Sequence, residues 1–441
     1  MSAMATHYAE NRNVIGWQID NEFSPNRCYC SNCDRAFSQW LRKKYGSLDN
    51  LNAEWGSIFW SNVITDWEQI VTPRFSGTPR GQTKHSHSVS LDFYRFASDS
   101  MLAFQNMQIE ILRKHAPGQF ITHNFMGLYD GIDGYKFAEP LDFVGWDCYR
   151  HAYDGERLPQ YKVALAHEVM RGLKRKKYWM LEQQSGYFSN DNYHPVINPG
   201  EFRLWTYDSI AHGADGIVYY RWRSSRFGQE QLANALMRHD GTPTRSYDEL
   251  KVITSELSKV SKELAKTSPS AECAIMWDYD QIWATQIHMV NKGFEYREHL
   301  AKYYYAFWRL NIPVDIVNPY EDLTRYKFVI APNLFVLEER VADSLKSYVK
   351  NGGSALVTFL SGTKTINHVV QDEMMPAKLT ELCGVRVLEF DGRPPEYTNY
   401  VILDRNTGFS SNVKRNKFAV GNTMEILELR GAQPKAVYTK E

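Results

Sequence analysis

Two apolar runs in this sequence end on a glutamate. Residues 14–22 begin apolar and end on Asn21 and Glu22, and residues 178–184 carry Glu182 after a similar apolar stretch. An apolar run that turns polar is typical of a buried parallel strand that reaches the rim of a cleft. Two carboxyl groups facing one substrate could provide the acid and the second carboxylate that cleavage of a glycosidic bond requires. The alternative for each glutamate is a helix cap or an ion pair.

The surrounding pattern predicts a parallel α/β fold that would bring these residues to one rim. Asp20 and Glu22 share a face by the two-residue period of a strand, and His123 and Asp147 end further strands. We expect Asp147 to orient its neighbours, and His123 either to be hydrogen-bonded at the rim or to contact a sugar. The predicted strands are 14–22, 120–125, 141–149, 178–184 and 216–222, and the predicted helices are 34–45, 88–115, 161–172, 199–212 and 248–266. Chemistry at the carboxyl ends of such strands is typical of a (β/α)8 barrel. Five strands leave two alternatives, a barrel whose first three strands precede Met1 or an open doubly wound sheet.

The pattern changes near residue 270. We expect two domains, an α/β domain over residues 1–266, which is a partial TIM barrel under the first of these alternatives, and a smaller flavodoxin-like α/β domain over residues 270–441. The second region has no phosphate-binding glycine loop and no obvious nucleophile or base at its strand ends. It is therefore predicted to have a structural or assembly role.

Three of the six cysteines stand close together as Cys28, Cys30 and Cys33. Thiolates at this spacing can converge on one tetrahedral zinc ion. The alternatives are three reduced surface thiols and, more weakly, an iron–sulfur cluster. Local spacing supplies only three ligands, so a structural zinc site would be incomplete within this motif.

The composition and charge of the chain limit the classes of molecule that it is expected to bind. The 441 residues carry 51 basic and 51 acidic side chains, which provides no electrostatic case for nucleic acid or an anionic membrane surface. No apolar run reaches the roughly 18 residues of a membrane span, and the stretch after Met1 is unlike a signal peptide, so we expect a cytoplasmic protein. Aromatic residues make up 14% of the chain. Among them, Trp60, Trp146 and Tyr149 could present rings to a sugar. Asn21 could bind a hydroxyl beside the reacting carbon.

Several ordered motifs over residues 13–245 carry a resemblance. They are Trp17-Gln-Ile-Asp-Asn-Glu-Phe, the cysteine motif, Leu51-Asn-x-x-Trp-Gly-x-x-Phe-Trp-Ser, Thr122-His-Asn-Phe-Met, Gly145-Trp-Asp-x-Tyr, Met180-Leu-Glu-Gln-Gln, Arg203-Leu-Trp, Ala211-His-Gly-Ala-Asp-Gly and Tyr220-Arg-Trp-Arg. Together they resemble the glycoside hydrolase family 42 β-galactosidases, and residues 270–441 resemble that family's trimerisation domain.

The resemblance implies a function and roles for particular residues. It implies hydrolysis of terminal β-D-galactosides with retention, with Glu22 as acid/base after barrel strand four and Glu182 as nucleophile after strand seven. It implies that Glu230 helps to bind substrate, that no cofactor takes part in catalysis, and that the intact protein forms a homotrimer. It also implies truncation at both ends, with the fourth zinc ligand upstream. The alternatives are a related retaining α-L-arabinopyranosidase or β-glucosidase, or a fragment without activity.

Overall fold

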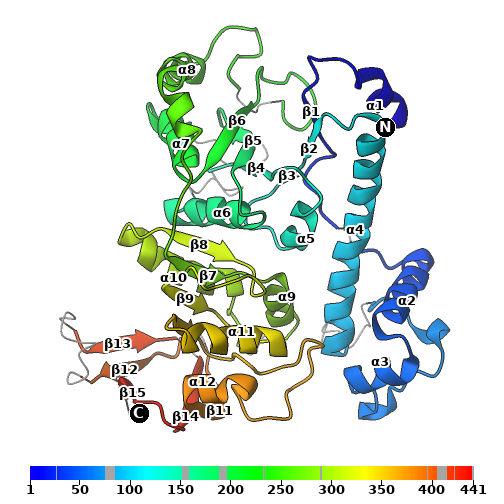
Figure 1. Cartoon of the computed structure of the whole chain (residues 1–441), viewed down its shortest axis with the longest axis vertical. Helices are drawn as coiled ribbons and strands as arrows, with labels where there is room; N and C mark the ends of the chain where they lie inside the picture. The colour runs from blue at the N-terminus through cyan, green and yellow to red at the C-terminus, as the bar shows by residue number, and fades with distance from the viewer. Residues whose placement is uncertain are drawn as a thin grey trace. The chain divides into compact units, whose positions relative to one another are not determined.

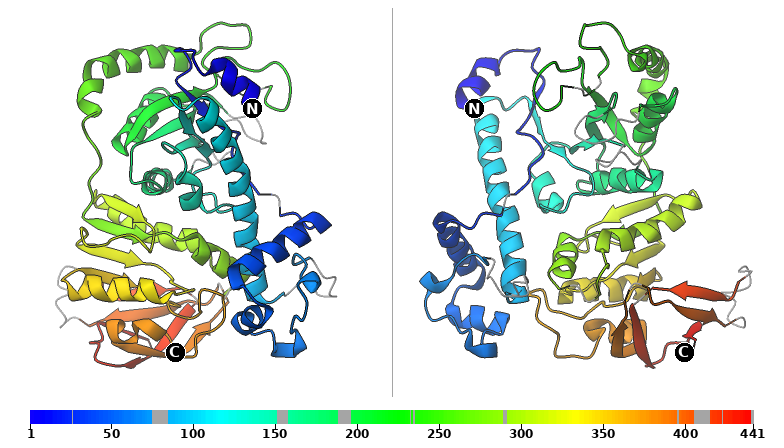
Figure 2. Two further views of the ribbon diagram at one scale, coloured as in Figure 1. Left: turned by 45° about the vertical axis from the view of Figure 1, so that its right-hand side comes forward. Right: turned by 180° about the vertical axis from the view of Figure 1, so that it is seen from behind.

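The computed structural model forms two compact units, which we describe separately. It describes residues 1–25, 27–74, 85–150, 158–187, 196–231, 233, 235–288, 291–394, 396–404, 415–421 and 423–439. The first unit comprises residues 1–26, 97–277 and 301–318, and the second comprises residues 27–96, 278–300 and 319–441. Helices α4 (His87–His115) and α10 (Tyr296–Arg309) cross the division, and α4 is one unbroken helix in both views of Figure 2.

Parallel strands form the centre of the first unit. β1 pairs with β2, and the order of the neighbouring sheet is β3-β4-β5-β6. β2 and β3 are the two halves of the single strand predicted at 120–125, and His123 lies between them. The strands are β1 (Gly16–Gln18), β2 (Phe120–Thr122), β3 (Asn124–Phe125), β4 (Gly145–Cys148), β5 (Tyr178–Gln184) and β6 (Ala214–Tyr220). The five predicted strands are therefore present and parallel, which confirms the α/β class.

Amphipathic helices follow the strands, as the apolar spacing predicts. Figure 1 shows α6, α7 and α8 beside β4 to β6, and helix α6 is almost fully buried. The helices of the unit are α1 (Ser2–Tyr8), α5 (Gly134–Ala138), α6 (Gln160–Gly172), α7 (Glu201–Ala211) and α8 (Arg245–Leu264). Phe202 and Trp205 of α7 pack with Ile253 of α8 in one apolar cluster. Tyr219 of β6 packs against this cluster, so both helices contact the edge of the sheet.

Helix α6 also contacts a second parallel pair, β7 (Cys273–Met276) with β8 (Val314–Val317). A Cβ atom on Gly172 would lie 2.4 Å from the carbonyl oxygen of Ile316, so the close approach requires glycine. Asp315, 1% exposed, accepts hydrogen bonds from Arg171 at 2.8 Å and Arg175 at 2.9 Å. The buried carboxylate is thus compensated by two guanidinium groups.

The second unit begins with a helical region. Its elements are α2 (Ser31–Tyr45), α3 (Leu48–Trp55), the short helices η1 (Phe59–Ser61) and η2 (Trp67–Gln69), and the first residues of α4. The carboxylate of Asp92 accepts from Lys44 Nζ at 2.6 Å, Tyr45 Oη at 2.7 Å and Trp55 Nε1 at 3.0 Å. Aromatic packing around Phe37 and Phe93 completes this core.

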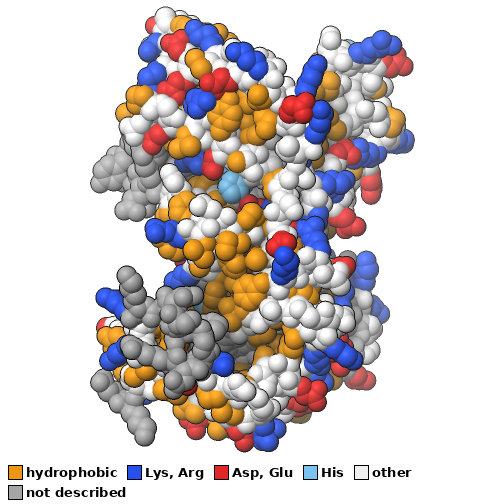
Figure 3. All heavy atoms as spheres, turned by 60° about the vertical axis from the view of Figure 1, so that its left-hand side comes forward, with side chains coloured by type: hydrophobic (Ala, Val, Ile, Leu, Met, Phe, Trp, Pro, Cys, Tyr) orange, Lys and Arg blue, Asp and Glu red, His pale blue; other side chains and the backbone are white. Residues whose placement is uncertain are grey.

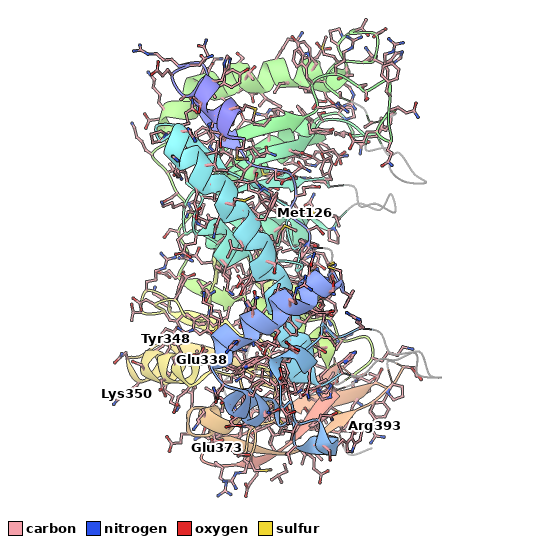
Figure 4. The ribbon with its side chains drawn as sticks, turned by 90° about the vertical axis from the view of Figure 1, so that its right-hand side faces the viewer. Met126, Glu338, Tyr348, Lys350, Glu373 and Arg393 are labelled. Carbon is pink, nitrogen blue, oxygen red and sulfur yellow. The ribbon has the colours of Figure 1, made fainter. Side chains whose placement is uncertain are left out.

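The rest of the second unit is mixed. It contains α9 (Tyr279–Ile287), β9 (Phe328–Ala331), α11 (Glu339–Lys350), β10 (Ser354–Val357), η3 (Ala377–Leu379), α12 (Thr380–Cys383), β11 (Val385–Gly392), β12 (Asn399–Leu403), β13 (Lys417–Val420), β14 (Thr423–Leu429) and β15 (Ala436–Tyr438). β9 and β10 are parallel, whereas β11–β14 and β13–β12–β15 are antiparallel. Figure 4 labels Tyr348 on α11, whose hydroxyl donates to the carbonyls of Tyr326 and Ser354.

The exterior carries mixed charge. On the face drawn in Figure 3, acidic and basic side chains are interspersed along the upper and right-hand edges. Within the part of the chain that the structure describes, no helix is both long and apolar enough to cross a membrane.

Candidate active site

The segment after β1 leaves the strand in a tight turn. The prediction of a strand through Glu22 is wrong, because β1 ends at Gln18, and Asp20 and Glu22 have φ values of 53° and 44°. Such left-handed residues are held only where surrounding contacts determine the conformation. Asp20 consequently leaves the face predicted for it, and its Oδ2 accepts from Gln108 at 3.4 Å.

His123 holds this turn from the neighbouring strand. Its Nε2 accepts from the backbone N–H of Phe23 at 3.1 Å, so its Nδ1 carries the proton and donates to the carbonyl of Ile19 at 2.8 Å. The ring is fully buried, and burial lowers the pKa of His123 to about 4. Of the two alternatives for His123, the structure therefore favours the hydrogen-bonded structural residue.

Asn124 joins the turn to the next strand. Its side-chain oxygen accepts from the backbone N–H of Glu22 at 3.2 Å, while its amide nitrogen donates to Asn21 Oδ1 at 2.9 Å and Asp147 Oδ2 at 2.5 Å. One buried amide thus positions residues of two elements that are more than 120 positions apart in the chain. Met126, labelled in Figure 4, directly follows this strand.

Strands β4 and β5 bring Asp147, Tyr149 and Glu182 together. Asp147 lies opposite Glu182 in the register, and Tyr149 Oη donates to Glu182 Oε2 at 2.5 Å. Burial raises the pKa of the Glu182 carboxyl, the Tyr149 hydrogen bond opposes this, and the charges of Glu22 and Glu230 add to the rise. Burial of Tyr149 raises the pKa of its hydroxyl, and the charge of Glu182 raises it further, so the hydroxyl stays protonated.

Three carboxyl groups converge at this rim. Glu22, Asp147 and Glu182 each place one oxygen so that the three atoms lie within 4.8 Å of one another. Glu22 and Glu182 are half-buried, whereas Asp147 is 6% exposed. The two glutamates predicted to face one substrate therefore lie together in the structure. The sequence pattern predicts a neighbour-orienting role for Asp147 and a ring contact for Tyr149, and the structure places both at Glu182. The two-residue spacing of Asp147 and Tyr149 along one strand was the available signal that both face Glu182.

The other residues predicted to contact a sugar lie in different parts of the structure. Glu230 Oε2 accepts from Tyr220 Oη at 2.7 Å and Arg221 at 3.4 Å, and its charge acts on Glu182. Trp146, considered as a sugar platform, is 3% exposed and packs edge-on against His167, so its ring lies in the core. Trp60 belongs to the second unit, where it is 84% exposed and stacks on Phe59. Of the aromatic residues in the loop after Glu182, Phe188 and Tyr193 lie outside the described residues.

The cysteine motif forms a compact group in the second unit. The three Sγ atoms of Cys28, Cys30 and Cys33 lie within 4.8 Å of one another. Hydrogen bonds from the backbone of Cys33 and the thiol of Cys28 lower the pKa of Cys30 to about 7, and burial raises the pKa of Cys33 to about 12. Sulfurs around one tetrahedral zinc would stand about 3.8 Å apart, so the arrangement fits three of four ligands.

A separate cavity of about 590 Å³ lies between β6 and α8. Ile217, Tyr219, Ile253 and Leu257 contribute to its lining, and none of the three converging carboxyl groups does. Its volume alone does not make it a catalytic site, because the one carboxylate in its lining, Asp215, is ion-paired with Lys177 at 3.1 Å and no second acidic group lies beside it among the described residues of the lining.

Parallel strands of a (β/α)8 barrel with paired carboxyl groups at their carboxyl ends define the class of barrel glycoside hydrolases. Residues 1–260 match the family described as β-galactosidase, glycoside hydrolase family 42, and residues 271–441 match the β-galactosidase trimerisation domain. The chain belongs to the glycoside hydrolase family 42 β-galactosidases.

Relatives and solved structures agree with this assignment. The chain is 33% identical to a β-galactosidase of Haloferax lucentense over 98% of its own length and 68% of the relative's. It is 34% identical to a β-galactosidase of Planococcus sp. strain L4, covering 99% of itself and 64% of that protein. The crystal structure of β-galactosidase from Bacillus circulans sp. alkalophilus superposes with a TM-score of 0.93 at 31% identity, over 100% of this chain and 64% of the other. The chain thus spans about two thirds of the length of these proteins.

Proposed function

We propose that this protein hydrolyses terminal β-D-galactosides with retention of configuration at the anomeric carbon. The observation that carries the proposal is the convergence of Glu22 and Glu182, whose nearest oxygens lie within 4.8 Å. Retaining glycosidases hold their two carboxyl groups about 5–5.5 Å apart, whereas inverting enzymes need about 6.5–9.5 Å to admit a water molecule. The galactoside specificity is supported by the relatives, which are named β-galactosidases.

The two glutamates have different roles in the proposed reaction. Glu22 gives its proton to the glycosidic oxygen as the bond from that oxygen to the anomeric carbon breaks, while a Glu182 oxygen forms a new bond to the carbon. Glu22, now ionised, then takes a proton from water, whose oxygen displaces Glu182 and releases galactose. The Tyr149 hydrogen bond keeps Glu182 ionised and oriented for the first step.

Four residues are proposed to bind the sugar. Asn21 is held by Asn124 and can donate from its amide to a hydroxyl beside the reacting carbon. Glu230, steadied by Tyr220, can accept from a second hydroxyl. Tyr149 and Trp60 are proposed as ring contacts.

Azide rescue of two glycine variants tests the assignment of roles. With an activated aryl galactoside, Glu182→Gly plus azide should yield the α-galactosyl azide, because azide attacks directly from the face that the nucleophile has left. Glu22→Gly should yield the β-galactosyl azide, because azide attacks the galactosyl–enzyme from the opposite face. Exchanged products would exchange the two roles, and no azide product from either variant would contradict the proposed mechanism.

Zinc binding and trimer formation are further parts of the proposal. Cys28, Cys30 and Cys33 would hold a structural zinc as thiolates and stabilise the segment that precedes α2. Elemental analysis should find zinc in the wild type and less in Cys30→Ser, with Cys273→Ser as the matched control. Residues 270–441 would mediate a homotrimer, which light scattering would detect as three times the mass of the 441-residue chain.

A further inference from the structure

Asp147 is a third carboxyl group that the two-glutamate mechanism does not use. It lies on β4 opposite Glu182 and is 6% exposed. Its Oδ2 accepts from the amide of Asn124 at 2.5 Å. Its Oδ1 is buried, and among the described residues no group donates a hydrogen bond to that atom. A buried carboxylate oxygen without a donor is costly, which indicates that this atom has a partner of another kind.

The surroundings favour the protonated form of Asp147. Ionised Glu182 within 4.8 Å would repel a second negative charge, and no lysine or arginine is among the described groups that act most strongly on the Asp147 carboxyl. Burial raises the pKa of Asp147 to about 9, and the charge of Glu182 adds to the rise. When protonated, Oδ1 becomes a donor, and the carboxyl groups beside it are the available acceptors. Glu182 already receives the Tyr149 hydroxyl, so Glu22 is the favoured acceptor.

We propose that Asp147 keeps its proton at neutral pH and donates a hydrogen bond from Oδ1 to Glu22, and that it is therefore a positioning residue for the acid/base. This inference rests on the proposed function for its catalytic meaning. Asp147 keeps its proton through the reaction, so only the Glu22 proton moves to the glycosidic oxygen. The hydrogen bond orients Glu22 while it is an acid and stabilises the carboxylate that remains after proton transfer.

Leaving-group dependence separates a positioning role from a merely structural one. Asp147→Asn retains a neutral donor of similar shape, whereas Asp147→Ala removes it, and Asp215→Asn on the outer side of β6 is the control. We expect Asp147→Ala to lose roughly 10- to 100-fold in kcat/KM on an alkyl galactoside, the effect of one hydrogen bond to a charged group. The loss should be far smaller on a dinitrophenyl galactoside, whose leaving group needs no proton. Asp147→Asn should stay close to wild type on both substrates.

Infrared spectroscopy tests whether the carboxyl group of Asp147 is protonated, and it needs no substrate. At pH 7 the wild type should show the C=O band of a protonated carboxylic acid, which Asp147→Asn removes and Glu22→Gln shifts by changing the hydrogen-bond acceptor. Absence of the band, or a band unmoved by Glu22→Gln, would overturn the inference. Saturable loss of the band on adding Mg²⁺ or Ca²⁺ would also overturn it, because the three carboxyl groups would then be a cation site.

The kinetic and spectroscopic results also keep the two proposals separate. An equal loss of kcat/KM in Asp147→Asn and Asp147→Ala would refute positioning by a neutral donor, even if the wild-type enzyme is active. If the wild type cleaves no galactoside, the proposed function fails, while the infrared band still decides whether Asp147 is a protonated donor to Glu22.

Discussion

The hydroxyl of Tyr149 donates to Glu182 and opposes the rise in the pKa of Glu182 that burial causes, and the variant Tyr149→Phe tests this contribution. A hydrogen bond to a charged group is worth about 1.5–3 kcal/mol. Glu182 is only half-buried, so solvent screening places the loss in the lower part of that range, about 1.5–2 kcal/mol. At 1.36 kcal/mol per unit, the pKa of Glu182 should rise by about one unit or slightly more. The nucleophile must be ionised, and its pKa is already raised by burial. The acid limb of kcat/KM should therefore move to higher pH by that amount.

The assay is kcat/KM against pH on an activated aryl galactoside. At a pH below the limb, Tyr149→Phe should be about tenfold slower than wild type, since one pKa unit is a factor of ten. The plateau at higher pH should change less. Tyr219→Phe is the matched control, because its hydroxyl bonds Thr206 rather than Glu182. An acid limb that stays in place in Tyr149→Phe, or moves equally in the control, would refute the reasoning.

Three further variants probe other parts of the structure. His123→Leu should lower the free energy of unfolding by about 2–4 kcal/mol in urea titrations, because the bonds to Ile19 and Phe23 are lost. The pKa of His123 is lowered from 6.5 to about 4 in the folded protein, so the free energy of unfolding of the wild type should fall as the pH drops from 6.5 to 4. His123→Leu should lack this part of the pH dependence. Equal pH profiles of stability in the two proteins would contradict the prediction. Gly172→Ala should cost about 1–3 kcal/mol because its Cβ meets the Ile316 carbonyl at 2.4 Å, whereas Gly118→Ala, with nothing within 4 Å, should be near neutral. Trp60→Ala should raise KM for galactosides with kcat unchanged if the exposed ring binds sugar, and an unaltered KM would remove Trp60 from the site.

Sequence patterns predicted the parts of the fold that depend on local periodicity. The amphipathic repeats locate α4 and α6 to within a residue or two, and the apolar run before Glu182 locates β5. The turn at Asp20 to Glu22 was read as strand, because the bonds that hold it come from residues about 100 positions away. No local pattern carries that information.

Two of the antiparallel strands near the end of the chain, β12 and β13, were not predicted, for a different reason. β12 and β13 have only five and four residues. β12 carries a short apolar run, but few residues of either strand are buried, and no clear alternation marks them. Helix α9 was also missed, because its residues are buried nearly all round and show no polar face. For the site, residue types along β4 and β5 predicted the carboxyl groups, but the Asn124 contacts required the tertiary structure.

Helix α6 is buried between two sets of strands, and this affects how the chain can be divided. One side of the helix packs on β4 and the other on β8, and Arg171 pairs with Asp315 across the second contact. Expression of residues 1–266 alone would expose the apolar outer side of α6 and remove Asp315, one of the two carboxylates that pair with Arg171. Such a fragment should aggregate or bind hydrophobic dyes even though every strand that carries a candidate catalytic residue is retained. A stable catalytic fragment must therefore keep the strand β8 that covers α6, and should not end at the last element of the catalytic sheet.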